Sequence, residues 1–198
     1  SEMCIRDRGD DVTMFKPVYK GSGGGNGGYS ASGGAGGGAA MYAFVEGVFN
    51  LAGIIDMRGA DGQRAACGNA GGGGGSGGSI FISAKRISGT GTLDVSGGNG
   101  GDGDGGSPQS PGGGGGSGRV AICFWEKIDG WDWTINTNGG LGGLKSSYPL
   151  VRAESGESCA PVVIQLGGVG DGFIQSFPCY GGEVVEGHMD TVYASDFG

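Results

Sequence analysis

Glycine makes up 53 of the 198 residues, and its arrangement in blocks constrains the fold more than any other feature of the chain. Each glycine that becomes ordered loses about 0.5 to 1 kcal/mol more conformational entropy than an alanine would. Composition alone therefore favours disorder. Against this, 36% of the residues are hydrophobic, and they stand in discrete blocks between the glycine runs, which is not typical of disordered chains. A compact fold for this chain needs repeated layers that support one another.

The apolar blocks recur along the chain. Three of them, 41–57, 80–95 and 120–137, begin about 40 residues apart and are separated by glycine blocks centred on 71–75 and 112–116. Apolar side chains alternate within them, as in Ile80 and Ile82, which predicts half-buried β-strands. Because one such unit cannot bury its apolar face alone, we expect the units to stack.

A polar residue closes each unit at the same place. Asp56 and Asp94 align with a shift of 38 residues, and Asn136 follows with a shift of 42. Stacked units would place these side chains in one column of two carboxylates and one amide. The column is either part of a binding groove or an outward-facing polar ladder.

Residues 77–84, 87–98 and 112–124 resemble the glycine-rich repeats of bacterial, phage and protist surface proteins that have a pectin-lyase-like right-handed parallel β-helix. The resemblance covers 21–143, with irregular spacing and a Trp-rich third unit as departures. It implies secretion and an adhesive or structural role. Some relatives with that fold are polysaccharide lyases, which use calcium-binding carboxylates and a basic residue in one groove, and those sites cannot be placed on this sequence.

We therefore predict an all-β fold, a right-handed parallel β-helix-like stack of about three units with glycine-rich, polyproline-II-like loops on one edge. Residues 21–145 form the repeat domain, and 146–198 form a degenerate repeat or cap that is truncated. Residues 1–20 form an irregular N-terminal segment. Within it, residues 1–8 resemble a translated sequencing-adapter remnant of assembled environmental data, so we expect them to be foreign to the natural protein.

The glycine blocks allow two interpretations. Glycine runs in the polyproline-II conformation can lie side by side and bond to one another, because no side chain keeps their backbones apart. They would then form a stiff layer that presents short loops such as 107–111 to a target. The alternative is a set of flexible tethers, as Gly/Ser linkers form.

Charge and hydropathy exclude several partners. The net charge is −8 with only 12 Lys and Arg residues, so a surface that tracks nucleic-acid phosphates is not expected. The most apolar stretch, 39–55, is shorter than the roughly 20 residues of a membrane span and contains Glu46. We expect no membrane span, and neighbouring repeats of the same chain as the main contacts.

Cysteine usage bears on the compartment. Cys4 belongs to the adapter-like residues, which leaves four cysteines: Cys67, Cys123, Cys159 and Cys179. They permit two disulfides in three possible pairings, or they are buried free thiols. Together with the resemblance, the disulfide interpretation places the protein outside the cell or on its surface.

Two clusters are candidate binding sites. Residues 97–105 resemble one calcium-binding nonapeptide of the repeats-in-toxin family, with Asp102 and Asp104 as ligands, although Asp104 stands where that family has a large apolar residue. The alternative is a solvated glycine loop without a metal. Trp125, Trp131 and Trp133 are candidate platforms for the sugar rings of a cell-surface or matrix glycan. For them the alternative is the packed core of a terminal unit.

Catalysis is not expected. His188 is the only histidine, and no motif fixes its geometry relative to Cys179 or Asp190. The sequence predicts a non-catalytic extracellular structural or adhesive module. The alternatives are a fragment of a carbohydrate-active β-helix enzyme and a disordered glycine-rich matrix or linker protein.

Overall fold

The computed structural model describes residues 19–27, 33–65, 70–104, 110–145 and 151–165, which contain nine strands. One parallel sheet has the order β1-β3-β5-β9, formed by β1 (Ala40–Asn50), β3 (Ser79–Ser88), β5 (Arg119–Lys127) and β9 (Val162–Gln165). A second parallel sheet is formed by β2 (Ile54–Asp56), β4 (Thr92–Asp94) and β6 (Thr134–Asn136). The short strands β7 (Leu144–Lys145) and β8 (Val151–Arg152) form an antiparallel pair.

The repeat seen in the sequence is the repeat of the sheets. Ala40 of β1 pairs with Ser79 of β3, and Ser79 pairs with Arg119 of β5, so neighbouring strands lie about 40 residues apart in the chain. Each predicted unit gives one strand to each parallel sheet, and β9 adds a fourth strand to the larger one. The all-β, parallel part of the prediction is therefore confirmed, and the period survives as fixed strands.

The hydrophobic core lies between the two parallel sheets. Ile80, Ile82 and Ile87 of β3 are fully buried and belong to one cluster with Leu93 of β4. Each of these side chains contributes about 1.5 to 3 kcal/mol through burial. The prediction of a half-buried strand is wrong for β3, which is buried on both faces from Ser79 to Ala84, whereas β1 is an edge strand and leaves Phe44 58% exposed. The stack thus depends on its middle unit.

No helix among the described residues is long and apolar enough to cross a membrane. The apolar stretch 39–55, in particular, contains strands β1 and β2.

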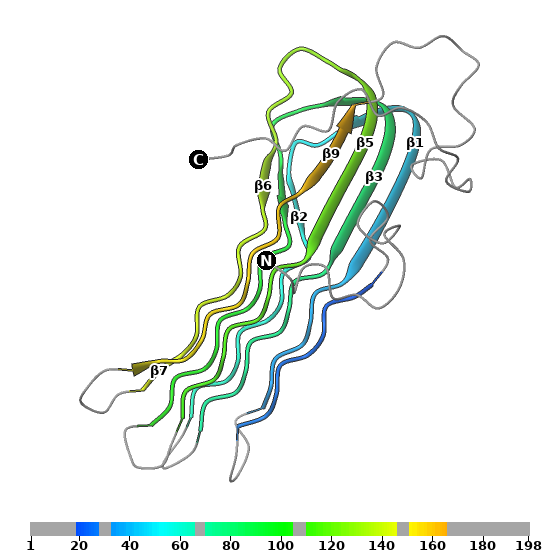
Figure 1. Cartoon of the computed structure of the whole chain (residues 1–198). Helices are drawn as coiled ribbons and strands as arrows, with labels where there is room; N and C mark the ends of the chain where they lie inside the picture. The colour runs from blue at the N-terminus through cyan, green and yellow to red at the C-terminus, as the bar shows by residue number, and fades with distance from the viewer. Residues whose placement is uncertain (1–18, 28–32, 66–69, 105–109, 146–150, 166–198) are drawn as a thin grey trace, which may run out of the picture.

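Away from the sheets the chain continues as long, irregular segments that run side by side (Figure 1). We call them together the glycine array; its members are segments 19–27, 33–39, 57–65, 70–78, 96–104, 110–118, 138–143 and 153–160. Segments 33–39, 70–78, 110–118 and 153–160 lead into the strands of the large sheet. Segments 57–65, 96–104 and 138–143 leave the strands of the small sheet. The array is therefore an extension of the same stack.

Backbone hydrogen bonds hold the array together with a period of three residues. The amides of segment 70–78 face three neighbouring segments in turn, so every third amide faces the same one. The donors are Gly71 and Gly74 toward segment 110–118, Gly72 and Gly75 toward segment 57–65, and Gly73 and Ser76 toward segment 19–27. Three residues per turn is the period of the polyproline-II helix, which has no internal hydrogen bonds. The glycine blocks are ordered where they are described, and the flexible-tether interpretation is wrong there.

Gly98 shows why this packing requires glycine. A Cβ atom built at Gly98 would fall on the carbonyl group of Ala60 in the neighbouring segment, and backbone cannot move aside as a side chain can. Gly36, on an outer position of segment 33–39, has nothing within 4 Å of its Cβ position. The array therefore requires glycine at its inner positions and tolerates side chains at its outer ones.

This difference can be measured. We expect Gly98→Ala to lower the free energy of unfolding by about 3 kcal/mol or more, because the added methyl group forces two backbones apart. Gly36→Ala is the control. It should leave the free energy of unfolding unchanged or raise it by about 0.4 to 1 kcal/mol, since alanine restricts the unfolded chain. Denaturant unfolding of both variants checks this, and equal effects would contradict the inner and outer assignment.

Candidate functional site

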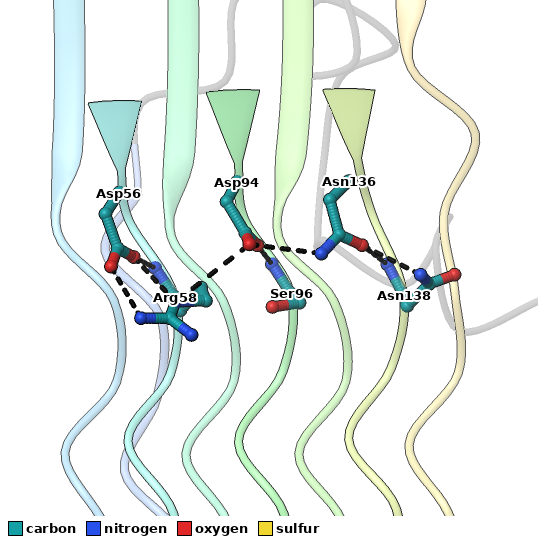
Figure 2. Close-up of polar contacts among 6 residues, drawn as sticks. All are labelled: Asp56, Arg58, Asp94, Ser96, Asn136 and Asn138. Carbon is teal, nitrogen blue, oxygen red and sulfur yellow. Dashed lines mark hydrogen bonds and ion pairs between the residues drawn. The ribbon is translucent and has the colours of Figure 1, made fainter. Parts of the chain in front are cut away.

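A polar ladder crosses the last residues of the small sheet. Asp56, Asp94 and Asn136 end β2, β4 and β6, and the register pairs Asp56 with Asp94 and Asp94 with Asn136 (Figure 2). The predicted column of two carboxylates and one amide is therefore confirmed. Its position, where strands give way to the glycine array, is what the alignment of the three units indicated.

Each member of the ladder caps the turn that follows it. Asp56 Oδ1 accepts the Arg58 amide at 3.1 Å, and Asp94 Oδ1 accepts the Ser96 amide at 2.9 Å. Asn136 Oδ1 accepts the Asn138 amide at 3.3 Å. Asp and Asn often bond the backbone two residues on, which turns the chain out of extended structure. The ladder therefore marks where the two-residue β period changes to the three-residue period of the array.

The ladder is also bonded across the units. Asn136 Nδ2 donates to Asp94 Oδ2 at 3.1 Å, and the guanidinium of Arg58 donates to both carboxylate oxygens of Asp56, at 2.9 and 2.7 Å. Arg58 Nε lies 4.0 Å from Asp94 Oδ2. The Arg58 guanidinium thus lies close to the carboxylates of both Asp56 and Asp94. The hydrogen bond from Arg58 lowers the pKa of Asp56, and the same bond raises the pKa of Arg58. The polar groups of the ladder are used for internal bonds.

Side chains also accept three outward-facing amides on one outer face of the array. Asp61 Oδ1 accepts the Asn99 amide at 2.6 Å, and Asn99 Oδ1 accepts the Leu141 amide at 2.8 Å. Asp102 Oδ1 accepts the Leu144 amide at 2.8 Å. These amides point away from the array, where no neighbouring segment offers a carbonyl acceptor. The roles of Asp61 and Asn99 were missed in the sequence, although they stand 38 residues apart, as Asp56 and Asp94 do.

The calcium candidates, Asp102 and Asp104, lie in segment 96–104. The carboxylate of Asp102 already has a bond to Leu144, which gives it a structural role. Among the described residues no group of three or more His, Cys, Asp and Glu side chains is placed to hold a metal ion. The calcium site stays a prediction.

The three tryptophans do not form one platform. Trp133 is 3% exposed and donates its Nε1 hydrogen to the Ser88 carbonyl oxygen at 3.0 Å, so its ring has no open face for a sugar. Trp131 is half-buried beside it, with ring centroids 5.8 Å apart, and Lys127 Nζ lies 4.8 Å from its ring centroid. Trp125 is half-buried on β5 and, within the described residues, makes no ring contact with either of them. The core alternative describes Trp133, and a glycan role is left to Trp131 and Trp125.

Two of the four cysteines, Cys123 and Cys159, are disulfide-bonded. Cys67 and Cys179 lie outside the described residues, as do His188, Asp190, loop residues 107–109 and the adapter-like residues 1–8. The disulfide interpretation is thus supported over free thiols for the two described cysteines.

No protein-family model, curated protein or solved structure matches this chain in comparisons with known proteins. The class that the fold defines is an all-strand protein with stacked parallel sheets. Any function must therefore be argued from the geometry.

The Asp56–Arg58 pair predicts a pH effect. A carboxylate whose folded pKa is depressed adds stability above its unfolded pKa, near 4, and that stability is lost as the pH falls through the folded value. We expect Asp56 to titrate below its ordinary pKa in a carboxyl-carbon NMR titration, and to move back toward it in Arg58→Gln. Both side chains are about half exposed, so the difference in unfolding free energy should be small at pH 7, weaker in high salt, and absent in strong acid. An identical titration in both proteins would contradict the pairing.

Asp102 offers a test of structure against calcium. In calcium-free buffer we expect Asp102→Ala to lower the free energy of unfolding by about 1 to 2 kcal/mol, because the Leu144 amide loses its acceptor. Asp102→Asn keeps an oxygen at that place and should stay within about 0.5 kcal/mol of the parent chain. If the alanine variant is harmless without calcium, and both variants abolish a calcium-dependent gain in stability, the calcium interpretation holds instead.

Proposed function

We propose that this chain is a non-catalytic structural or adhesive module of an extracellular or cell-surface protein. In this proposal the parallel sheets are part of a right-handed β-helix-like stack of about three units, and the glycine array is a stiff arm. The far end of the arm presents connecting loops to a glycan or matrix surface. The observation that carries the proposal is the common end point of the array segments.

The registers bring the ends of the segments together. The Ala65 amide bonds Asp102, the Gly103 amide bonds Leu144, and the Gly71 amide bonds Ser110. Segments 57–65 and 96–104 and strand β7 therefore end side by side, at the end of the array farthest from the large sheet (Figure 1), and the connections 66–69, 105–109 and 146–150 follow them in the sequence. A rigid scaffold that carries several adjacent loops at one end is the common arrangement of binding proteins, because loops vary without disturbing the fold.

Stiffness supports an arm over a tether. Within the array most inward amides are bonded to a neighbouring backbone, and side chains such as Asp61 and Asn99 accept some of the outward ones on one face. A network of segments bonded to several neighbours has little freedom to bend, so the segment ends from which the loops start are held at a fixed distance from the sheets.

Two properties support an extracellular location. Disulfides such as those of Cys123 and Cys159 persist in oxidising compartments and are rare in the cytosol. The net charge of −8 limits self-association of an exposed protein. The polar groups that an enzyme would direct at a substrate, Asp56, Arg58 and Asp94, are instead bonded to one another or to the backbone.

The proposal is tested by binding of the fluorescently labelled chain to a glycan array and to matrix-coated surfaces. We expect binding to fall at least tenfold when Ser107, Pro108 and Gln109 are all replaced by glycine, because the loop loses its side chains. Glu46→Gln, on edge strand β1, is the control and should bind as the parent chain does. If Trp131→Ala loses binding while the loop replacement keeps it, the contact lies at the aromatic end of the sheets instead. No binding to any surface would overturn the adhesive function.

A further inference from the structure

The glycine array contains one groove that is occupied by the chain itself. Segment 19–27 lies against segments 33–39 and 70–78, on the side opposite to segment 57–65. Its amides at Gly21 and Gly24 donate to the carbonyl oxygens of Gly38 and Ala35, both at 2.8 Å. In return Gly25 and Ser22 accept the amides of Gly73 and Ser76, at 2.8 and 3.0 Å. The groove thus offers two carbonyl groups from one wall and two amides from the other.

The repeat creates the same groove one unit further on. Segments 70–78 and 110–118 form its walls, and the register of β3 and β5 places Gly113 and Gly116 where Gly73 and Ser76 stand in the first groove. By the register of β1 and β3, the counterparts of the carbonyl groups of Ala35 and Gly38 are those of Gly74 and Gly77.

These four backbone groups have no hydrogen-bond partner in the part of the chain that the structure describes. The amides of Gly113 and Gly116 donate to nothing, and the carbonyl groups of Gly74 and Gly77 accept nothing. The other amides from Gly112 to Gly118 are all bonded to neighbouring segments. The unbonded groups therefore fall at every third residue, on the one side of segment 110–118 that faces the second groove.

In the described part of the chain the second groove is open along segment 110–118, whereas Gly74 and Gly77 on its other wall are buried. Gly113 is exposed, and a Cβ atom built at Gly113 or Gly116 would meet nothing closer than 3.8 Å. At Gly73, in the occupied groove, the Cβ position lies 3.1 Å from the Gly25 amide nitrogen. On the opposite face of the array three outward amides, those of Asn99, Leu141 and Leu144, are closed by the side chains of Asp61, Asn99 and Asp102. No side chain does the same for Gly113 and Gly116 in the described residues.

We propose that this groove, between segments 70–78 and 110–118, binds a glycine-rich segment of another polypeptide in the extended polyproline-II conformation. The bound segment would run antiparallel to both walls, as segment 19–27 does. It would need glycine at every third position, since a Cβ atom at Gly21 or Gly24 would fall on the carbonyl oxygen of Ser76 or Gly73. The ligand class is therefore a Gly-x-x-Gly peptide, recognised through its backbone as an added β-strand is recognised at a sheet edge. This contact lies on the side of the arm and is separate from the loop end discussed above.

The probe is a synthetic peptide with the sequence of residues 19–27, added to the intact, isotope-labelled chain. We expect the amide signals of Gly113 and Gly116 to shift, and their hydrogen exchange to slow about tenfold at a peptide concentration ten times its dissociation constant. A peptide with Gly21→Val and Gly24→Val should cause neither effect, because its side chains meet the walls of the groove.

Two matched variants of the chain test the location. Gly113→Val fills the groove at an open position, so it should fold as the parent chain does and lose the peptide response. Gly36→Val makes the same change at another open position, and this variant should keep the peptide response. The proposal is overturned if the peptide leaves Gly113 and Gly116 unchanged, or if it acts instead on Gly73 and Ser76 by displacing segment 19–27. Protection of Gly113 and Gly116 that rises with protein concentration, without peptide, would also support the groove and identify a second copy of the chain as its occupant.

Discussion

The close approach of neighbouring backbones without intervening side chains is the constraint on which the rest of the structure depends. Segment 70–78 is bonded to five other segments of the array, and the space between neighbouring segments is too small for a Cβ atom at positions such as Gly98. Such contacts bury little apolar surface, and a backbone hydrogen bond contributes only about 0.5 to 1.5 kcal/mol net, while ordering one residue costs about 1 to 2 kcal/mol. The array is therefore not self-sufficient. It is stable because the apolar core between the parallel sheets, centred on Ile80, Ile82 and Leu93, fixes the ends from which its segments start.

The polar ladder connects these two parts. Asp56, Asp94 and Asn136 stop the strands at one level in each unit, and their bonds to the residue two positions on turn the chain toward the array. Because the three turns occur in register, the three-residue period begins at the same height in each segment. The bonds between Gly97 and Asn138, and between Gly59 and Ser96, depend on that common starting point. A ladder of this kind has a structural task that explains its polar residues without a ligand.

Much of this architecture could be predicted from the sequence, because it is carried by periodicity. The alternation of apolar residues at Ile80 and Ile82 predicted the strands. The shared spacing of Asp56, Asp94 and Asn136 predicted the ladder. What escaped prediction depends on the position of one segment relative to another. The acceptors Asp61 and Asn99 are ordinary surface residues until the register shows which amides face them. Trp131 and Trp133 were ambiguous because a large aromatic suits a core and a sugar platform equally, and only packing decides between them.

The three-residue period of the array has a consequence for how such a chain can change in length. Inserting one residue into a segment turns everything beyond it by a third of a turn, so that side chains point inward and glycines outward. Inserting three residues into each segment restores the orientation and adds about 9 Å to the arm. The reach of the loops from the sheets can therefore vary among related chains only in discrete steps, and only if adjoining segments lengthen together.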